Sequence, residues 1–295
     1  MIVFVCGQSN LCIGYGKFGR CGSVSFLPMF KFHRICLGIF WLWILVTAFA
    51  ATGAEIDDDM VLIRAGPFTM GGDNGPEDER PQHRVTLGDF FIDRNKVTND
   101  QFSRFMNDRG IKAADGPSWY DVDDNDARIR RRNGRWTADP GHENNPVVEV
   151  SWHGARAYCE WLGKRLPTEA EREKAARGTD GRKYPWGNDP PDKTRAHFGG
   201  GWNELKPVGS FARGASPYGV LDMAGNGWEW VSSAYRPYPY HPQDGREDLN
   251  RDAVRGTRGG GHDSPPDELT ATQRGRRVSR NPRGGHHNIS FRCAR

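Results

Sequence analysis

The chain has 295 residues, of which 36% are hydrophobic, 26% charged and 11% aromatic; these proportions fit a packed globular domain and exclude a disordered polyampholyte, a collagen and a multi-span membrane protein. The formal net charge is +4. All of this excess lies in residues 1–54, so the remainder carries 37 basic and 37 acidic groups and has no overall basic surface for nucleic acid.

The N-terminal segment contains an uncharged apolar run over residues 35–51, preceded by Lys31 and Arg34 and followed by small residues. This order is typical of a secretory signal, for which Met29 would be a more typical start. An uncleaved membrane anchor is the alternative, because 17 residues are at the lower limit of a span. Both interpretations predict that residues 55–295 form a single exported domain, periplasmic or secreted, which meets a membrane only if residues 1–54 stay attached.

The cysteines are divided between these two regions. Four of the six lie in residues 1–54, which leaves Cys159 and Cys293 in the predicted domain. Two cysteines in an exported domain suggest one disulfide, and two buried free thiols are the alternative.

Local patterns predict short strands and a few helices in chain order. Short apolar runs within 60–70 and loose alternation over 83–93 predict extended segments. Thr98 is a predicted N-cap for a helix that Gly110 ends, and residues 151–163 show clear helical spacing. Thr168 and Glu171 form a predicted capping box that opens a further helix, to about Arg177. Helical periodicity is absent after residue 178, so we expect a mixed α+β fold with two to three helices and long ordered loops.

An acidic segment, Asp121–Asp126, resembles the beginning of an EF-hand calcium loop. The sixth position of that loop requires glycine and is Asp126 here, and the twelfth requires glutamate and is Arg132. We therefore interpret the segment as a solvated surface excursion whose acids pair with the arginines at 128–132.

Nine short motifs follow one another through residues 60–295. They are RAGPFTMG (64–71), VTN (97–99), NPVV (145–148), VSWH (150–153), GKRLPTEAE (163–171), PWGN (185–188), DMAGNGWEW (222–230), RGGG (258–261) and FRCA (291–294). This series resembles the formylglycine-generating enzyme family, also called sulfatase-modifying factor domains. The resemblance implies an irregular α+β fold with a C-type lectin-like core and a disulfide between Cys159 and Cys293.

The resemblance also implies the chemistry of the active family members, which oxidise a sulfatase cysteine with oxygen and a copper ion held by two cysteines. Counted from Gly259 and Gly260, these two positions are Ser264 and Leu269 in this chain. Neither residue supplies a thiolate, the soft ligand that Cu(I) requires. Copper is therefore not expected.

A structural calcium ion is a further implication of the resemblance. Its ligands would be Asp222, the backbone carbonyls of Gly225 and Gly227, and Glu229, and hard oxygen ligands of this kind suit calcium. The alternative is that the glycines only form a turn, while Trp228 and Trp230 fill the core.

The family's substrate groove would be bordered by Trp228 and residues 260–269, which makes His262, Asp263, Ser264 and Arg277 candidate ligand contacts. A different metal near His262, His286 and His287 is conceivable, although solvated or capping histidines are the simpler interpretation. The arginines at 274, 276, 277, 280 and 283 are interpreted as a solvated, partly core-anchoring face.

These observations together predict an exported, calcium-stabilised domain that binds an unknown peptide, protein or glycan and has no formylglycine-generating activity. The alternative is an oxidoreductase, acting either in sulfatase maturation or with another metal on the same fold.

Overall fold

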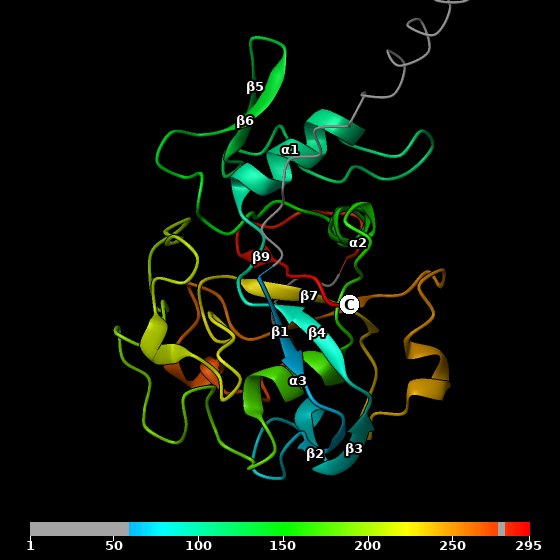
Figure 1. Cartoon of the computed structure of the whole chain (residues 1–295), viewed down its shortest axis with the longest axis vertical. Helices are drawn as coiled ribbons and strands as arrows, with labels where there is room; N and C mark the ends of the chain where they lie inside the picture. Colours follow the sequence, from blue (N-terminus) through cyan, green and yellow to red (C-terminus); the bar gives the residue numbers. More distant parts are fainter. Residues whose placement is uncertain (1–58, 277–280) are drawn as a thin grey trace, which may run out of the picture. The chain divides into compact units, whose positions relative to one another are not determined.

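The computed structural model describes residues 59–276 and 281–295 (Figure 1). The predictions for residues 1–54, and those for Arg277 and Arg280, lie outside these ranges. Within them, no helix combines the length and the apolar character that a membrane span requires.

Four short strands form two nested antiparallel pairs at the beginning of the domain. The outer pair is β1 (Met60–Ile63) with β4 (Phe90–Asp93), and the inner pair is β2 (Gly66–Met70) with β3 (His83–Leu87). The segments are extended as the apolar runs predict, and alternate side chains such as Ile63 and Ile92 are buried. In the sequence, β2 and β3 lie between β1 and β4. The outer pair therefore joins the first and the last of these four strands.

Two helices build the aromatic core. Helix α1 (Asn99–Arg109) begins at the predicted N-cap, where the Thr98 side chain accepts from Gln101 N and the Gln101 side chain accepts from Thr98 N. Helix α2 (Trp152–Trp161) begins after Ser151. Phe102 of α1 stacks on Tyr158 of α2, with ring centroids 5.6 Å apart. Aromatic pairs at this separation contribute beyond their buried area.

Helix α3 (Glu169–Arg177) is buried along its whole length, although its sequence is EAEREKAAR. Thr168 and Glu171 form the predicted capping box. The charges inside are paired: Glu169 lies 2.7 Å from Arg274 Nε and 3.4 Å from Arg258 Nη1. Because a buried ion needs partners of opposite charge, α3 can occupy the interior only together with the arginines that surround it. Arg274 is thus a core-anchoring residue.

The arginine-rich segment forms a strand, and its arginines are solvated as predicted: Arg131 and Arg132 are exposed. Strands β5 (Ile129–Arg132) and β6 (Arg135–Ala138) form a hairpin that lies against α1 (Figure 1). The turn residues Asn133 and Gly134 both have positive φ, which is the pattern of a two-residue hairpin turn. Arg130 and Arg132 pair with Asp139, so the predicted pairing with Asp121–Asp126 is wrong.

Strand β7 (Trp228–Ala234) is the middle strand of the three-stranded sheet. It pairs antiparallel with β8 (Arg255–Arg258) and parallel with β9 (Ile289–Ser290), and all seven of its residues are buried. Figure 1 shows β7 passing between α2 and α3; Trp152 Nε1 of α2 donates to Val231 O, at 2.8 Å. The mixed fold with few helices, short strands and long loops is confirmed.

Candidate functional site

The two positions implied as copper ligands lie on the loop between β8 and β9. Ser264 is buried, and its Oγ accepts from Gly261 N (3.0 Å) and donates to Glu268 Oε2 (3.1 Å). Leu269 is fully buried in an apolar cluster that includes Tyr184. A hydrogen-bonded alcohol and an aliphatic side chain in the core supply no soft ligand. The residues present at these positions therefore do not fit a copper ion.

His262 lies next to these positions and is fully buried. Neither of its ring nitrogens has a hydrogen-bond partner among the described residues. Burial lowers its pKa to about 4 in spite of the neighbouring Asp263, so the ring is neutral at physiological pH. No set of three described His, Cys, Asp or Glu ligand atoms within 4.8 Å of one another includes His262. A buried imidazole without partners is unusual.

Asp263 and His287 lie in contact beside His262. Asp263 Oδ2 lies 3.4 Å from His287 Nε2 and accepts from Asn288 Nδ2 at 3.1 Å. Burial alone would raise the pKa of Asp263, but these hydrogen bonds and the nearby His262 lower it to about 2. The carboxylate is therefore ionised. His287 in turn stacks on Trp202, with ring centroids 3.6 Å apart.

Trp202 is 69% exposed. Its loop is hydrogen-bonded to Ser264 and to the nearby His262: Gly199 N donates to Ser264 O and Gly200 N donates to His262 O, both at 2.8 Å. Trp202 Nε1 also donates to Asp126 Oδ2, at 2.6 Å. We refer to Trp202, His287 and Asp263 as the Trp202 patch.

The sequence analysis did not predict Trp202 as a binding residue, because a lone tryptophan after three glycines is no recognisable motif. It predicted instead that Trp228 borders the substrate groove, and this prediction is wrong. Trp228 is 2% exposed and belongs to the main hydrophobic core, where it packs against Gly261. It therefore does not border an open groove.

Three of the four predicted calcium ligands come together, but around the ammonium group of Lys96. Lys96 Nζ donates to Gly227 O (2.6 Å), Gly225 O (3.2 Å) and Glu229 Oε1 (3.0 Å), and its side chain is completely buried. Asp222 contributes to the electrostatic environment of Lys96, and its Oδ2 accepts from a backbone N–H. Sequence reasoning did not connect Lys96 with this segment.

Glu229 binds two further cations. Its Oε1 accepts from Arg172 Nη2 (2.9 Å) and Arg292 Nη2 (3.2 Å), and its Oε2 accepts from Arg292 Nε (2.7 Å). Burial would raise the pKa of Glu229, but Arg172, Arg292 and Lys96 hold it well below its ordinary value. Burial lowers the pKa of Lys96 to about 8, with the arginines adding to the fall and Glu229 opposing it. This arrangement does not fit a calcium ion, because its oxygens already accept from buried cations.

A second charged cluster joins the acidic segment to a distant residue. Carboxylate oxygens of Asp121, Asp124 and Glu149 lie within 4.8 Å of one another. Glu149 is 3% exposed, and burial, followed by the charges of Asp124, Asp121 and Asp126, raises its pKa to about 8. The acidic segment therefore packs against a buried carboxyl group instead of pairing with arginines.

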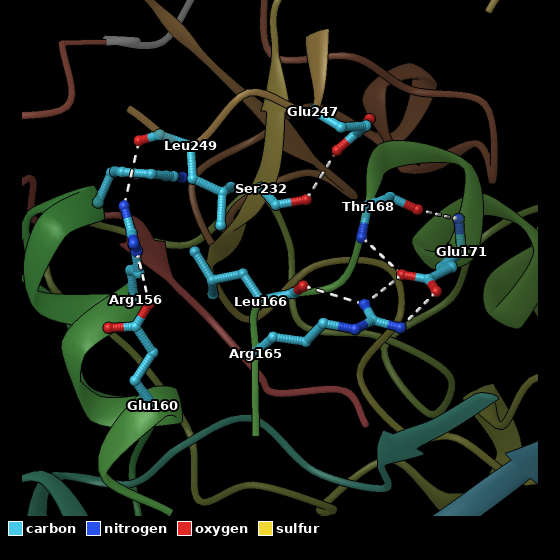
Figure 2. Close-up of a pocket in the computed structure, with 10 residues that line it drawn as sticks. Arg156, Glu160, Arg165, Leu166, Thr168, Glu171, Ser232, Glu247 and Leu249 are labelled. Atoms are coloured by element: carbon cyan, nitrogen blue, oxygen red, sulfur yellow. Dashed lines mark hydrogen bonds and ion pairs between the residues drawn. The ribbon is translucent and has the colours of Figure 1, made fainter. Parts of the chain in front are cut away.

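A cavity of about 260 Å³ lies between α2 and α3 (Figure 2), and its lining includes the apolar side chains of Trp152 and Leu166. Its charged residues already have partners within the protein. Arg165 forms two hydrogen bonds of 2.7 Å with Glu171, and Arg156 Nε donates to Glu160 at 2.7 Å. Its lining includes no residue of the Trp202 patch and neither Ser264 nor Leu269. We therefore take the Trp202 patch, which lies beside Ser264, as the candidate site.

The chain is similar to several known proteins. Serine/threonine-protein kinase pkn1 of Chlamydia pneumoniae is 38% identical over 245 residues, which cover 80% of this chain but only 38% of the kinase. Inactive C-alpha-formylglycine-generating enzyme 2 of Mus musculus is 33% identical over 293 residues, covering 86% of this chain and 91% of that protein. The chain thus spans about two fifths of the first relative and most of the second.

The solved structure of PvdO from Pseudomonas aeruginosa superposes with a TM-score of 0.61 at 31% identity, covering 80% of this chain and 93% of PvdO. Residues 47–295 match the sulfatase-modifying factor enzyme 1-like domain. The chain therefore belongs to the sulfatase-modifying factor, or formylglycine-generating enzyme, family.

Proposed function

We propose that this domain is a binding module of its family and does not generate formylglycine. The observation that carries the proposal is the state of the two copper positions: Ser264 is held by Glu268, and Leu269 is part of the core. Oxygen activation by Cu(I) needs thiolates at the metal. A relative named as inactive, matching over most of its length, supports the view that this fold is used without that chemistry.

The Trp202 patch is the proposed binding surface. Stacking on His287 holds the exposed indole in one orientation, which limits the entropy lost when a ligand binds it. Asp263 is ionised, and Asp126 and Glu204 lie nearby. An aromatic face surrounded by carboxylates suits the side chain of lysine or arginine through cation–π contact and ion pairing. We therefore favour a protein or peptide ligand with exposed basic residues over a neutral glycan.

We further propose that the domain works outside the cytosol. The apolar segment at 35–51 and the proximity of Cys159 to Cys293 support this location, since disulfides persist in oxidising compartments.

The absence of oxidase activity is tested with a peptide that carries the sulfatase cysteine motif. The purified domain is incubated with this peptide, copper and oxygen, and the peptide mass is followed, with an active formylglycine-generating enzyme as the positive control. We expect no aldehyde product above the no-enzyme background. Product formation would instead support the alternative, an oxidoreductase of sulfatase maturation.

The binding surface is tested with arrays of basic peptides, acidic peptides and neutral glycans. We expect the wild-type domain to retain basic peptides and Trp202→Ala to lose at least tenfold in affinity. Val254→Ala is the matched control, since Val254 is also an exposed apolar side chain (51%). Retention of glycans in place of basic peptides, or equal binding by both variants, would refute the proposed ligand class or the proposed surface.

A further inference from the structure

We propose that the ammonium group of Lys96 replaces a structural calcium ion in this domain. An internal cation then holds the loop at 222–229 against the rest of the fold, and the loop keeps its shape without calcium. This inference is independent of the proposed binding function, because Lys96 is completely buried.

Each N–H donor of the Lys96 ammonium group has an acceptor. An ammonium group has three N–H donors, and Nζ meets three acceptors: Gly225 O, Gly227 O and Glu229 Oε1. These are three of the four oxygen ligands that the motif predicts for calcium. One side chain therefore satisfies the inward-facing oxygens that a metal ion would otherwise bind.

The loop backbone is shaped to present these oxygens. Gly225 and Gly227 have φ of 77° and 102°, a region in which other residues are strained. A Cβ at Gly225 would lie 2.3 Å from His197 O, so only glycine fits there. Lys96 is equally well fixed, because the next residue, Val97, hydrogen-bonds through its backbone to both Phe291 and Val147. Two rigid segments thus meet at a single ammonium group.

The charge balance also favours lysine over calcium. Glu229 is already contacted by Arg172 and Arg292, and all three side chains are completely buried. Calcium requires six to eight oxygen ligands, whereas Glu229 Oε1 already accepts from three cationic donors. While Lys96 is in place, a calcium ion would add two charges to those of Lys96 and the two arginines, which is more than Glu229 and Asp222 can neutralise. Removing the ammonium lowers this positive charge and frees Gly225 O and Gly227 O for another cation.

Three variants separate replacement of calcium from ordinary stabilisation. Lys96→Ala removes the ammonium and leaves space for an ion, whereas Lys96→Met removes the charge and keeps the volume filled. Lys174→Ala is the matched control, because Lys174 is also buried and donates to two carbonyls, Arg64 O and Gly66 O, at 2.7 and 3.0 Å. Melting temperatures are measured in EDTA and in millimolar calcium chloride, and calcium binding is measured by titration calorimetry.

We expect the wild-type melting temperature to be the same in EDTA and in calcium. All three variants should melt lower in EDTA, and calcium should raise the melting temperature of Lys96→Ala alone, with saturable binding of one ion. If Lys96→Ala does not fold in EDTA, refolding in calcium is the same test, with recovery expected only for this variant. The proposal would be overturned if calcium raised the melting temperature of Lys96→Ala by no more than that of wild type or Lys174→Ala. It would also be overturned if Lys96→Ala failed to refold in either solution.

Discussion

At the scale of single residues, two buried glutamates of this domain have opposite protonation preferences. Glu229 lies among three cations and stays ionised, because their charges outweigh its burial. Glu149 is buried beside Asp121, Asp124 and Asp126, and burial and like charge both favour its protonated form. Glu229 is thus a permanently charged partner of buried cations, whereas Glu149 is a group that titrates.

Glu149 should make the stability of the domain depend on pH. Its pKa is about 8 in the folded state, against an ordinary value of 4.5, so the folded state binds the proton more tightly than the unfolded state does. The resulting stabilisation is complete below the ordinary pKa and is lost as the pH rises towards 8. At roughly 1.4 kcal/mol per pKa unit, the loss is on the order of a few kcal/mol.

Glu149→Gln should remove this pH dependence, because the amide cannot ionise. Urea unfolding at several values between pH 5 and 8 measures the effect, and the variant should be the more stable protein at pH 8. Glu143→Gln, on the exposed surface, is the control and should follow the wild-type curve. A Glu149→Gln curve that falls with pH as steeply as wild type would contradict the assignment.

At the scale of elements, helix α3 shows how local and long-range interactions combine. Its capping box and its helix-forming residues mark where the helix begins from the local sequence alone. Its charged sequence is typical of a solvated helix, yet all nine residues are buried. Arg258 contacts both Glu169 and Glu173, and Lys174 bonds to carbonyls near β2. The helix is therefore a polar core element, and removing one of its buried charges would leave another unpaired.

At the scale of the whole molecule, a large part of the chain is in ordered loops, and long-range links must limit their freedom. Cys159 on α2 and Cys293 after β9 lie at opposite ends of a 134-residue stretch, with Cα atoms 5.6 Å apart. Closing so long a loop in the unfolded state removes conformational entropy worth about 4 to 5 kcal/mol in the chain-entropy model.

Replacing both cysteines with alanine should therefore lower the free energy of unfolding by roughly 2–5 kcal/mol. Urea denaturation measures the change, and wild type in reductant should match the double variant. Peptide mapping without reductant should recover the residues as one cross-linked pair. Free thiols at both positions, or coincident unfolding curves for oxidised wild type and the double variant, would count against the disulfide.

Several features of the fold and the site could be predicted from local pattern. The helix starts at Thr98 and Thr168 depend on hydrogen bonds between residues three apart, and the loss of thiolates at Ser264 and Leu269 is a matter of residue identity. The β5–β6 hairpin was missed because its arginines obscured the Asn133–Gly134 turn signal. Trp202 was missed because exposure depends on packing. Trp228 was misplaced for the same reason.

By itself, the sequence determined the family, the capped helices, the short strands and the absence of soft metal ligands at the former copper positions, since each follows from residues that are close along the chain. Only the tertiary structure decided which cation occupies the loop before β7, since Lys96 and Glu229 are 133 residues apart. It likewise decided that α3 is internal and that Glu149 meets the acidic segment. Electrostatic partners are selected by proximity in space, which the order of residues does not reveal.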